Sequence, residues 1–361
     1  MEQTIVGSLR HVTALIEKDQ LGEASAYLQR IACEQPEWID DRFQAELGMI
    51  MKQIEYKLAL KDFGYLRSLA LVYHYLELNY AKLFEESAKD ETGQFTGEQI
   101  MVWSLPESGN ESEGGTEELP DADTIWWCWL QGLESAPDIV KACYRSVQSL
   151  EKFGKRIVVL DSENLFEYVS LPSYVVEKYQ QGMIGMAHFA DLVRLELLTS
   201  RGGTWIDATA WISGTERLLS ILEEDLFFYR SGNVSEYLIF DNWFMHARKQ
   251  SRILEATKRL LYAYWQRENE AKHYFIFQLF MTLACKYNTE EYEKIPRFSN
   301  EPCHVLQYEL SKPFNERRWA QLLGMSDVHK LTYRLEESTE RKGTMLEKVM
   351  ETDAFTKKVL A

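Results

Sequence analysis

Apolar residues recur at helical spacing through roughly the first 90 residues of the chain. One stripe runs from Ile5 to Ile16 and a second from Ala59 to Leu76, and Pro36 is the only proline in this stretch. Side chains three or four residues apart share one face of a helix, so the stripes indicate amphipathic helices. The sequence predicts an N-terminal helical domain over residues 1–103, built as an antiparallel bundle. Such stripes are usually core, which favours a packing or oligomerisation role over a chemical one.

The pattern changes after residue 123. Short apolar runs at 124–130, 155–161 and 204–212 are typical of buried strands. Helical periodicity follows at 137–150, 165–168 and 183–200, and returns at 248–265, 273–287 and 316–323. Apolar strands that alternate with helices predict an α/β sandwich around a mostly parallel sheet. We expect this domain to cover residues 124–361.

The stretch between these two parts is acidic and rich in glycine. Residues 107–123 contain seven acidic residues and three glycines, and no Lys or Arg lies between Lys89 and Lys141. Such a segment buries little apolar surface of its own. We expect residues 104–123 to form a surface linker between the two domains.

Charge and cysteine usage exclude several classes of protein. The chain has 40 Lys and Arg against 56 Asp and Glu, a net charge of −16, which argues against a nucleic-acid-binding surface. No apolar run approaches the ~18 residues of a membrane span, and the N-terminus does not resemble a signal peptide. We expect a cytoplasmic protein that can touch the inner face of a membrane peripherally. Five cysteines without metal-site spacing fit a reducing compartment: Cys33, Cys128, Cys143, Cys285 and Cys303.

The richest polar pattern lies where the third helix of the α/β domain leads into its third strand. Asp191 and Arg194 are three residues apart and share one helical face. The pair Gly202–Gly203 allows a tight turn, and Asp207 follows near the end of the strand. Ligands of α/β sheets gather at the carboxyl ends of the strands. Carboxylates there can accept hydrogen bonds from sugar hydroxyls or bind a divalent metal, and arginine can pair with phosphate.

Five ordered stretches between residues 120 and 335 carry a resemblance to a known family. They are Ile125–Gly132, Lys155–Asp161 with Asn164, Met186–Thr209, Asn242–Phe244 with the later pairs Tyr264–Trp265 and Tyr274–Phe275, and Ser326–Tyr333. In this order they resemble the capsular polysaccharide synthesis protein family of glycosyltransferases. That family is related to glycosyltransferase family 32, with its DXD-type sugar-binding motif.

The resemblance implies a GT-A fold that binds a nucleotide sugar. A hexose would be moved from a donor, a UDP-sugar, to a saccharide or lipid-linked oligosaccharide acceptor, with retention of configuration. The product would be a capsular or other surface polysaccharide. Because one motif position departs from the family, a non-catalytic nucleotide-sugar-binding or sugar-binding protein on the same scaffold is the alternative.

Roles for individual residues follow from the same resemblance. Trp129 falls where relatives stack an aromatic ring on uracil, and Asp191 and Arg194 match positions that hold the sugar and ribose hydroxyls. Asp207 matches the first aspartate of the DXD motif. The late segment that closes over the diphosphate corresponds to Ser326, His329 and Lys330.

Two questions of mechanism stay open at the level of sequence. Asp241, beside Asn242, is the one carboxylate that could serve as a nucleophile in a double displacement, but a front-face route needs none. Thr209 stands where relatives have the second aspartate of the motif, and a threonine hydroxyl is a weak metal ligand. Either Mn²⁺ or Mg²⁺ is held by Asp207 and His329, or protein cations such as Lys330 neutralise the diphosphate. We expect the metal.

Overall fold

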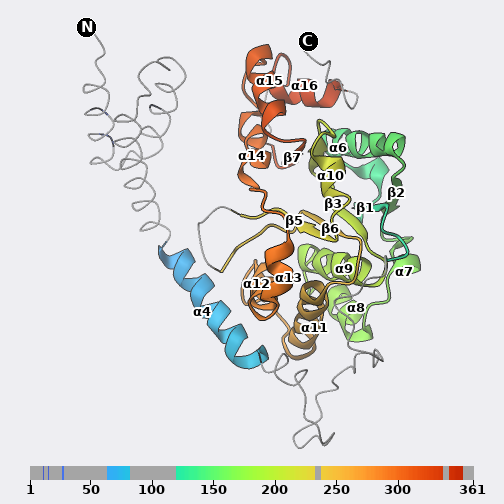
Figure 1. Ribbon diagram of the computed structural model, residues 1–361, viewed down its shortest axis with the longest axis vertical. Helices are drawn as coiled ribbons and strands as arrows, with labels where there is room; N and C mark the ends of the chain where they lie inside the picture. Colours follow the sequence, from blue (N-terminus) through green and yellow to red (C-terminus); the bar gives the residue numbers. More distant parts are fainter. Residues whose placement is uncertain are drawn as a thin grey trace, which may run out of the picture. The chain divides into compact units, whose positions relative to one another are not determined.

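The computed structural model describes His11, Leu15, Tyr27 and residues 63–81, 119–231, 237–335 and 341–352. The chain divides into two compact units, Met1–Leu71 and Val72–Ala361. The second unit holds the α/β fold (Figure 1). Apart from helix α4 (Phe63–Tyr80), the helices expected before residue 104 lie outside the residues described in full.

A five-stranded sheet forms the centre of the second unit. Its spatial order is β2 (Arg156–Leu160), β1 (Thr124–Cys128), β3 (Gly203–Asp207), β6 (Phe244–Ala247) and β5 (Leu226–Phe228). Strands β1, β2 and β3 are parallel, and β6 runs antiparallel to both of its neighbours. The mostly parallel α/β sandwich expected from the sequence is therefore confirmed. The short strands β5 and β6 were not expected.

The apolar run at 204–212 forms two strands rather than the one that its pattern predicts. Strand β3 ends at Asp207, the chain turns at Ala208 and Thr209, and β4 (Ala210–Ile212) leaves the sheet. Strand β4 pairs antiparallel with β7 (Val328–Lys330) in a separate two-stranded sheet. Strands β3 and β4 are both buried, so the pattern of apolar side chains does not show where one strand ends and the other begins. The turn brings the segment around residue 330 to the carboxyl end of β3.

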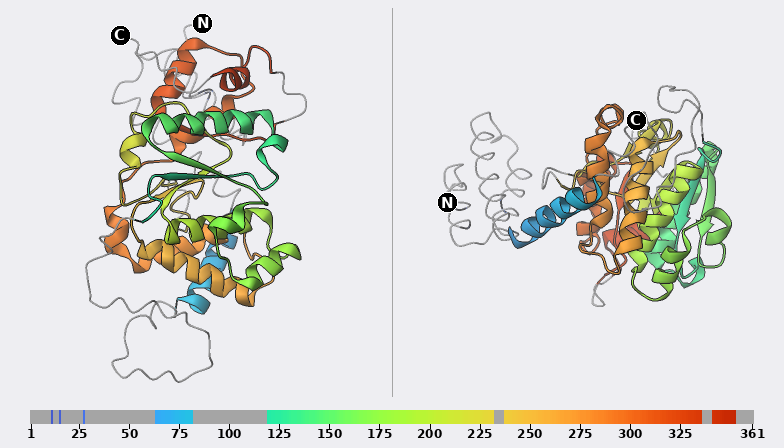
Figure 2. Two further views of the ribbon diagram at one scale, coloured as in Figure 1. Left: turned by 90° about the vertical axis from the view of Figure 1, so that its right-hand side faces the viewer. Right: turned by 90° about the horizontal axis from the view of Figure 1, so that it is seen from below.

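Helices cover both faces of the sheet (Figure 2). Helix α6 (Asp138–Gln148) buries Ile139, Cys143 and Val147 in a core shared with Trp127 and Ile206. Helix α9 (Met186–Ser200) lies on the opposite face, where it packs against β3 and β6. Successive side chains of a strand point to opposite faces, so neighbouring tryptophans of β1 serve both cores.

The remaining helices surround these layers. They are α7 (Leu165–Tyr168), α8 (Ser173–Gln180), α10 (Leu218–Ile221), α11 (Arg252–Arg267), α12 (Ile276–Tyr287), α13 (Thr289–Lys294), α14 (Glu301–His304), α15 (Glu316–Met325) and α16 (Met345–Glu351). Short 3₁₀ helices lie at Leu133–Ser135, Ser149–Phe153 and Leu306–Glu309. Among the described residues, none of the helices has the length and apolar content that a membrane crossing requires.

The Gly-Gly pair before β3 is required by close packing. Gly203 has φ of 93°, and a Cβ at this position would lie 2.4 Å from the carbonyl oxygen of Thr124. Gly202 has φ of 77° and accepts a hydrogen bond of 2.8 Å from Trp126 Nε1 at its carbonyl oxygen. Only glycine adopts such a backbone without strain. The pair therefore lets β3 enter the sheet directly beside β1.

The last residues of the expected linker pack against the α/β unit. Leu119 and Ala122 are buried, and the Leu119 amide donates to the carbonyl oxygen of Arg248 at 2.7 Å. Asp121 pairs with Arg201 at 3.0 Å. Residues 119–123 thus belong to the fold, and the rest of the expected linker lies outside the described residues.

The end of α4 also packs within the second unit. The ring of Tyr80 contacts Phe280 of α12 at a centroid distance of 5.4 Å, and the Tyr75 hydroxyl donates to Glu268 at 2.6 Å. Leu76 and Tyr80 are fully buried. The domain boundary at residue 103 stays a prediction, but the packing of residues 72–81 argues that they stabilise the α/β unit.

Candidate functional site

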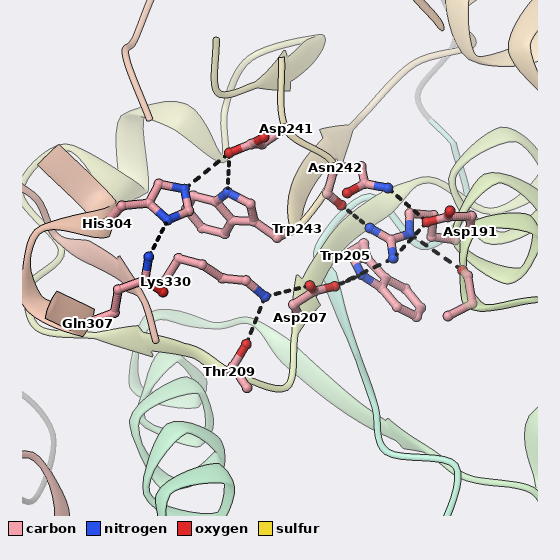
Figure 3. Close-up of polar contacts among 12 residues, drawn as sticks. Asp191, Trp205, Asp207, Thr209, Asp241, Asn242, Trp243, His304, Gln307 and Lys330 are labelled. Atoms are coloured by element: carbon pink, nitrogen blue, oxygen red, sulfur yellow. Dashed lines mark hydrogen bonds and ion pairs between the residues drawn. The ribbon is translucent and has the colours of Figure 1, made fainter. Parts of the chain in front are cut away.

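The carboxyl end of β3 carries a carboxylate that is bonded on both oxygens. Asp207 is its last residue and lies opposite Cys128, the last residue of β1. Its Oδ2 accepts from Lys330 Nζ at 2.7 Å, and its Oδ1 accepts from Trp205 Nε1 at 2.8 Å (Figure 3). Lys330 Nζ also donates to Thr209 Oγ1 at 2.7 Å. One ammonium thus bridges Asp207 and Thr209, the two residues that the sequence analysis compared with the ends of a DXD motif.

Strand β7 separates the two residues of the His-Lys pair. Lys330 reaches Asp207, whereas the fully buried His329 lies 2.9 Å from Ser213 Oγ through its Nε2 and packs beside the ring of Trp211. Adjacent side chains of a strand point to opposite faces, which explains the division. The sequence analysis expected His329 and Asp207 to hold a metal together. The structure does not bring these two side chains together.

The next cluster joins helix α9 to the segment that precedes β6. Arg194 Nη2 lies 3.1 Å from Asp191 Oδ1 and 3.6 Å from Asp207 Oδ1. Asn242 donates its Nδ2 to Asp191 Oδ1 at 2.8 Å, and its carbonyl oxygen accepts from Arg194 Nη1. The Arg194 guanidinium also lies over the ring of Trp205, 4.9 Å from the centroid. The predicted residues Asp191, Arg194, Asn242 and Asp207 are thus brought into one connected network.

Charge around Asp207 favours its ionised form. Burial by itself would raise the pKa of this carboxyl group, but the Lys330 ammonium and the Arg194 guanidinium outweigh burial and hold the pKa below its usual range. The hydrogen bonds from Lys330 and Trp205 act in the same direction. Asp207 is consequently an anion across the neutral pH range, held between two cations.

A second carboxylate lies one residue before Asn242. Asp241 Oδ2 accepts hydrogen bonds from Trp243 Nε1 at 3.0 Å, Asn300 Nδ2 at 2.5 Å and His304 Nε2 at 3.1 Å. Burial opposes ionisation here too, and the bonds from His304 and Asn300 overcome it and lower the pKa of Asp241. Asp241 and Asn242 are neighbours in the chain, yet their side chains have entirely separate partners.

The other two predicted site residues have different surroundings. Trp129 follows β1, is partly buried, and meets the ring of Tyr333 edge-on at a centroid distance of 5.5 Å. Its Nε1 has no hydrogen-bond partner among the described residues. Ser326 is buried, and its Oγ both donates to and accepts from the backbone of Val328, at 2.7 and 3.1 Å. Ser326 therefore shapes the turn into β7.

The side chains present do not fit a metal centre in their folded arrangement. Both oxygens of Asp207 and the hydroxyl of Thr209 are bonded within the protein, and His329 faces away. Over the ranges described above, no group of three or more His, Cys, Asp or Glu side chains could hold a metal ion. A divalent cation would have to compete with the Lys330 ammonium for the same oxygens.

Sequence reasoning missed several residues of this region. His188 Nδ1 lies 3.7 Å from Asp191 Oδ2, and its spacing of three residues on α9 was a usable signal. Trp205 alternates with Ile206 along β3, so its place on the face of Asp207 could also have been found. His304 and Asn300 lie about 60 residues from Asp241 and carry no pattern that links them to it.

Comparisons with solved structures return proteins of low sequence identity. The chain is similar to the crystal structure of a glycosyltransferase involved in the glycosylation of the major capsid of PBCV-1, with 10% identity and a TM-score of 0.32 over 63% of this chain and 98% of that one. It is also similar to the PaToxG glycosyltransferase, with 14% identity and a TM-score of 0.33 over 65% of this chain and 87% of that one. No curated protein matches the chain significantly.

The family model described as capsular polysaccharide synthesis protein matches residues 55–349. The match begins within the predicted N-terminal domain and includes every site residue named above. It confirms the family suggested by the ordered motifs. The chain belongs to the capsular polysaccharide synthesis protein family.

Proposed function

We propose that the protein is a glycosyltransferase that moves a hexose from a UDP-sugar to a saccharide or lipid-linked acceptor during surface polysaccharide synthesis. Family membership supports the reaction class. The observation that carries the proposal is the network at the carboxyl end of β3, where Lys330, Asp207, Arg194 and Asp191 are joined by contacts of 2.7–3.6 Å. Such an edge is where α/β sheets bind their ligands.

The two cations match the charge that develops during sugar transfer. The bond between the anomeric carbon and the phosphate breaks, its electron pair goes to the diphosphate, and the sugar passes through an oxocarbenium-like state. Lys330 and Arg194 stabilise the departing diphosphate, because preorganised donors act most strongly where charge grows. Asp191 and Asn242 are placed to hold sugar hydroxyls. Retention follows a front-face route, in which the acceptor hydroxyl passes its proton to the leaving phosphate.

We further propose that protein cations neutralise the diphosphate in place of Mn²⁺ or Mg²⁺. The Lys330 ammonium lies 2.7 Å from both Asp207 Oδ2 and Thr209 Oγ1, the position that a metal ion would need. A threonine removes one negative charge from the motif, which weakens attraction for a divalent cation and suits a monovalent ammonium. On this proposal Lys330 exchanges Asp207 for a donor phosphate oxygen when the nucleotide sugar binds.

Trp129 is the proposed platform for the base. It follows β1 at the same edge of the sheet as Asp207, and its half-buried ring is held by the edge-on contact with Tyr333. A flat apolar face suits a pyrimidine ring, since base–aromatic stacking tolerates any base. The exposed side chain of Tyr333 can adjust when the nucleotide enters.

The test is donor turnover with and without a chelator. Purified protein is incubated with a panel of UDP- and GDP-sugars, and release of the nucleoside diphosphate is followed with EDTA or with added Mn²⁺. We expect slow hydrolysis of a UDP-sugar that EDTA leaves unchanged. Asp207→Asn, purified in the same way, should lose on the order of 10²-fold in kcat, which excludes a contaminating hydrolase.

Other outcomes would change the assignment. Tight binding of a UDP-sugar without any turnover would favour the non-catalytic binding protein that Thr209 suggests. Turnover that requires Mn²⁺ would contradict the role given to Lys330. Absence of both binding and turnover across the panel would contradict the proposed function.

A further inference from the structure

The carboxylate of Asp241 is held by three hydrogen-bond donors from other residues. Three N–H groups converge on one oxygen, Oδ2: the indole of Trp243 at 3.0 Å, the amide of Asn300 at 2.5 Å and the imidazole of His304 at 3.1 Å. A carboxylate oxygen offers about two lone-pair positions. Oδ2 is therefore saturated, and the orientation of the carboxylate is fixed.

A second layer fixes the residues that donate to Asp241. Gln307 Nε2 lies 3.3 Å from His304 Nδ1, which sets Nδ1 as the acceptor and leaves Nε2–H to donate to Asp241. The Trp243 ring stacks on Tyr229 at a centroid distance of 5.0 Å and 14° between the planes. Asn300 Oδ1 is buried without a partner among the described residues, an unfavourable arrangement that the bond from Nδ2 to Asp241 imposes.

The other oxygen of Asp241 is open. Within the described ranges no hydrogen bond reaches Oδ1, while 26% of the side chain is exposed. The three bonds at Oδ2 also keep the pKa of Asp241 below its usual range. A carboxylate that stays ionised is a poor base at this low pKa, but its free oxygen can accept a charge-assisted hydrogen bond. Its open oxygen suits a neutral hydroxyl better than a proton-transfer role.

The position of Asp241 relative to the donor network indicates which hydroxyl it would meet. Asn242 points to Asp191 and Arg194, and Asp241 points away from them toward His304. In the view of Figure 3 the Asp207–Lys330 pair lies below both clusters, with Lys330 beneath His304 and Trp243 and Asp207 beside Trp205. Since the donor sugar is assigned to the Asp191 side, a molecule that meets Asp241 would lie on the His304 side, away from Asp191.

We propose that Asp241 Oδ1 binds a hydroxyl of the acceptor saccharide, and that His304 and Asn300 are positioning residues that aim it. This inference rests on the proposed function, because it assumes a sugar donor at Asp191 and Asp207. The bound hydroxyl is a neighbour of the one that reacts, so the reacting hydroxyl keeps its proton for the leaving phosphate. Asp241 then determines which acceptor sugars are oriented for attack.

The experiment separates acceptor binding from donor binding. With the UDP-sugar that the wild type turns over, methyl glycosides of glucose, galactose, mannose and N-acetylglucosamine are titrated as acceptors, and UDP release gives KM and kcat. Calorimetry gives the Kd of the donor. We expect Asp241→Asn to raise the acceptor KM at least tenfold while the donor Kd changes less than threefold, because the amide presents its N–H₂ where Oδ1 was. Asp138→Asn, on an exposed carboxylate of α6, is the matched control.

Two substitutions of His304, which differ in whether they keep the hydrogen bond to Asp241, test its role in positioning Asp241. His304→Gln keeps an N–H donor for Asp241 and should retain most of the acceptor affinity, whereas His304→Leu should raise the acceptor KM about as much as Asp241→Asn. Equal losses in both His304 variants, with a lowered melting temperature, would reduce the residue to a structural role and contradict the proposal. An Asp241→Asn variant whose donor Kd weakens in step with the acceptor KM would place Asp241 at the donor instead.

The proposal and the proposed function fail in different ways. If the wild type neither binds nor turns over any nucleotide sugar, the function is wrong. If it turns over the donor but no methyl glycoside accelerates UDP release, the acceptor role of Asp241 is wrong, because an open carboxylate oxygen built for a pyranose hydroxyl should admit at least one of the four sugars.

Discussion

Two lysine–aspartate pairs lie at opposite ends of the central strands. Lys330 and Asp207 meet at 2.7 Å at the carboxyl end of β3, and Lys155 and Asp123 meet at 2.6 Å just before β2 and β1 begin. The atoms and distances are nearly the same. The exposure of the carboxylates differs: Asp207 is 25% exposed and Asp123 is 56% exposed, while Lys330 and Lys155 are 19% and 7% exposed.

The neighbours of each pair decide what it can do. At the amino end Arg248 and Glu223 complete an ion-pair network that water can reach, so its charges are already compensated. Such pairs contribute modestly to stability. At the carboxyl end Arg194 adds a second cation to Asp207, whose side chain is less exposed than that of Asp123, so its charge interacts more strongly with its partners. On the proposed function, the same kind of pair serves stability at the amino end and anion binding at the carboxyl end.

Among the variants that compare the two lysine–aspartate pairs, we expect the largest loss of activity for Lys330→Ala. Lys330→Ala should lower kcat for donor turnover about 10²- to 10³-fold, the loss typical of one charge-stabilising donor. Lys155→Ala should leave kcat unchanged, because its charge acts on the fold alone. Steady-state UDP release measures both variants. Similar losses in the two would erase the distinction between the ends of the sheet.

A double variant asks whether Lys330 takes the place of a metal. Combining Lys330→Ala with Thr209→Asp restores the second carboxylate of the motif and removes the competing ammonium. Part of the lost turnover should then return with Mn²⁺ and disappear with EDTA. If Mn²⁺ does not act on the double variant, the position between Asp207 and residue 209 is not equivalent to a metal site.

Strand β1 begins directly after Asp123 at the amino end of the sheet, and Trp129 follows it at the carboxyl end. Trp129→Ala should weaken UDP binding by ~1–3 kcal/mol, as in other aromatic–base contacts. Calorimetric titration of UDP measures the change, with the buried Trp127 on the same strand left intact. An unchanged Kd would assign Trp129 to the core alone.

Acid should act first on the amino end of the sheet. His246 of β6 is buried beside Thr204, and burial together with the nearby Arg248 charge lowers its pKa from 6.5 to about 3. Between pH 6.5 and about 3 the unfolded state binds a proton at His246 and the folded state does not. The free energy of unfolding is therefore highest above pH 6.5 and decreases as the pH falls toward 3. The free energy of unfolding should decrease by about 2 kcal/mol at pH 5, at 1.36 kcal/mol per unit. Urea unfolding at pH 7.5 and 5.0 tests this, and His246→Gln should show a shallower pH dependence.

The smallest effect is expected for Lys155→Met. Methionine keeps the buried stem of the side chain, of which 7% is exposed, and removes the ammonium. Because Asp123 remains largely hydrated, the free energy of unfolding should fall by about 0.5–1 kcal/mol. Chemical denaturation measures it, and donor turnover should be unaffected. A loss of several kcal/mol would mean that this pair is as enclosed as Lys330 and Asp207.

Local sequence patterns predicted the elements that present the site. The strands at 124–128 and 156–160, the helix at 186–200 and the position of Asp207 at a strand end are all found in the structure. These features depend on side chains close in sequence, whose spacing records which face is buried. The strands at 226–228 and 244–247 were missed because three or four residues are too few to show a period.

What each side chain of the site meets was decided by tertiary structure. Lys330 reaches Asp207 across 123 residues of sequence, and His329 turns away only because β7 pairs with β4 in one register. A shift of one residue would exchange the two side chains. The sequence by itself determined the family, the sandwich and the chemistry available at its edge. The choice between a metal-binding pair and a lysine-bridged carboxylate rested on strand register, which no pattern within a single segment records.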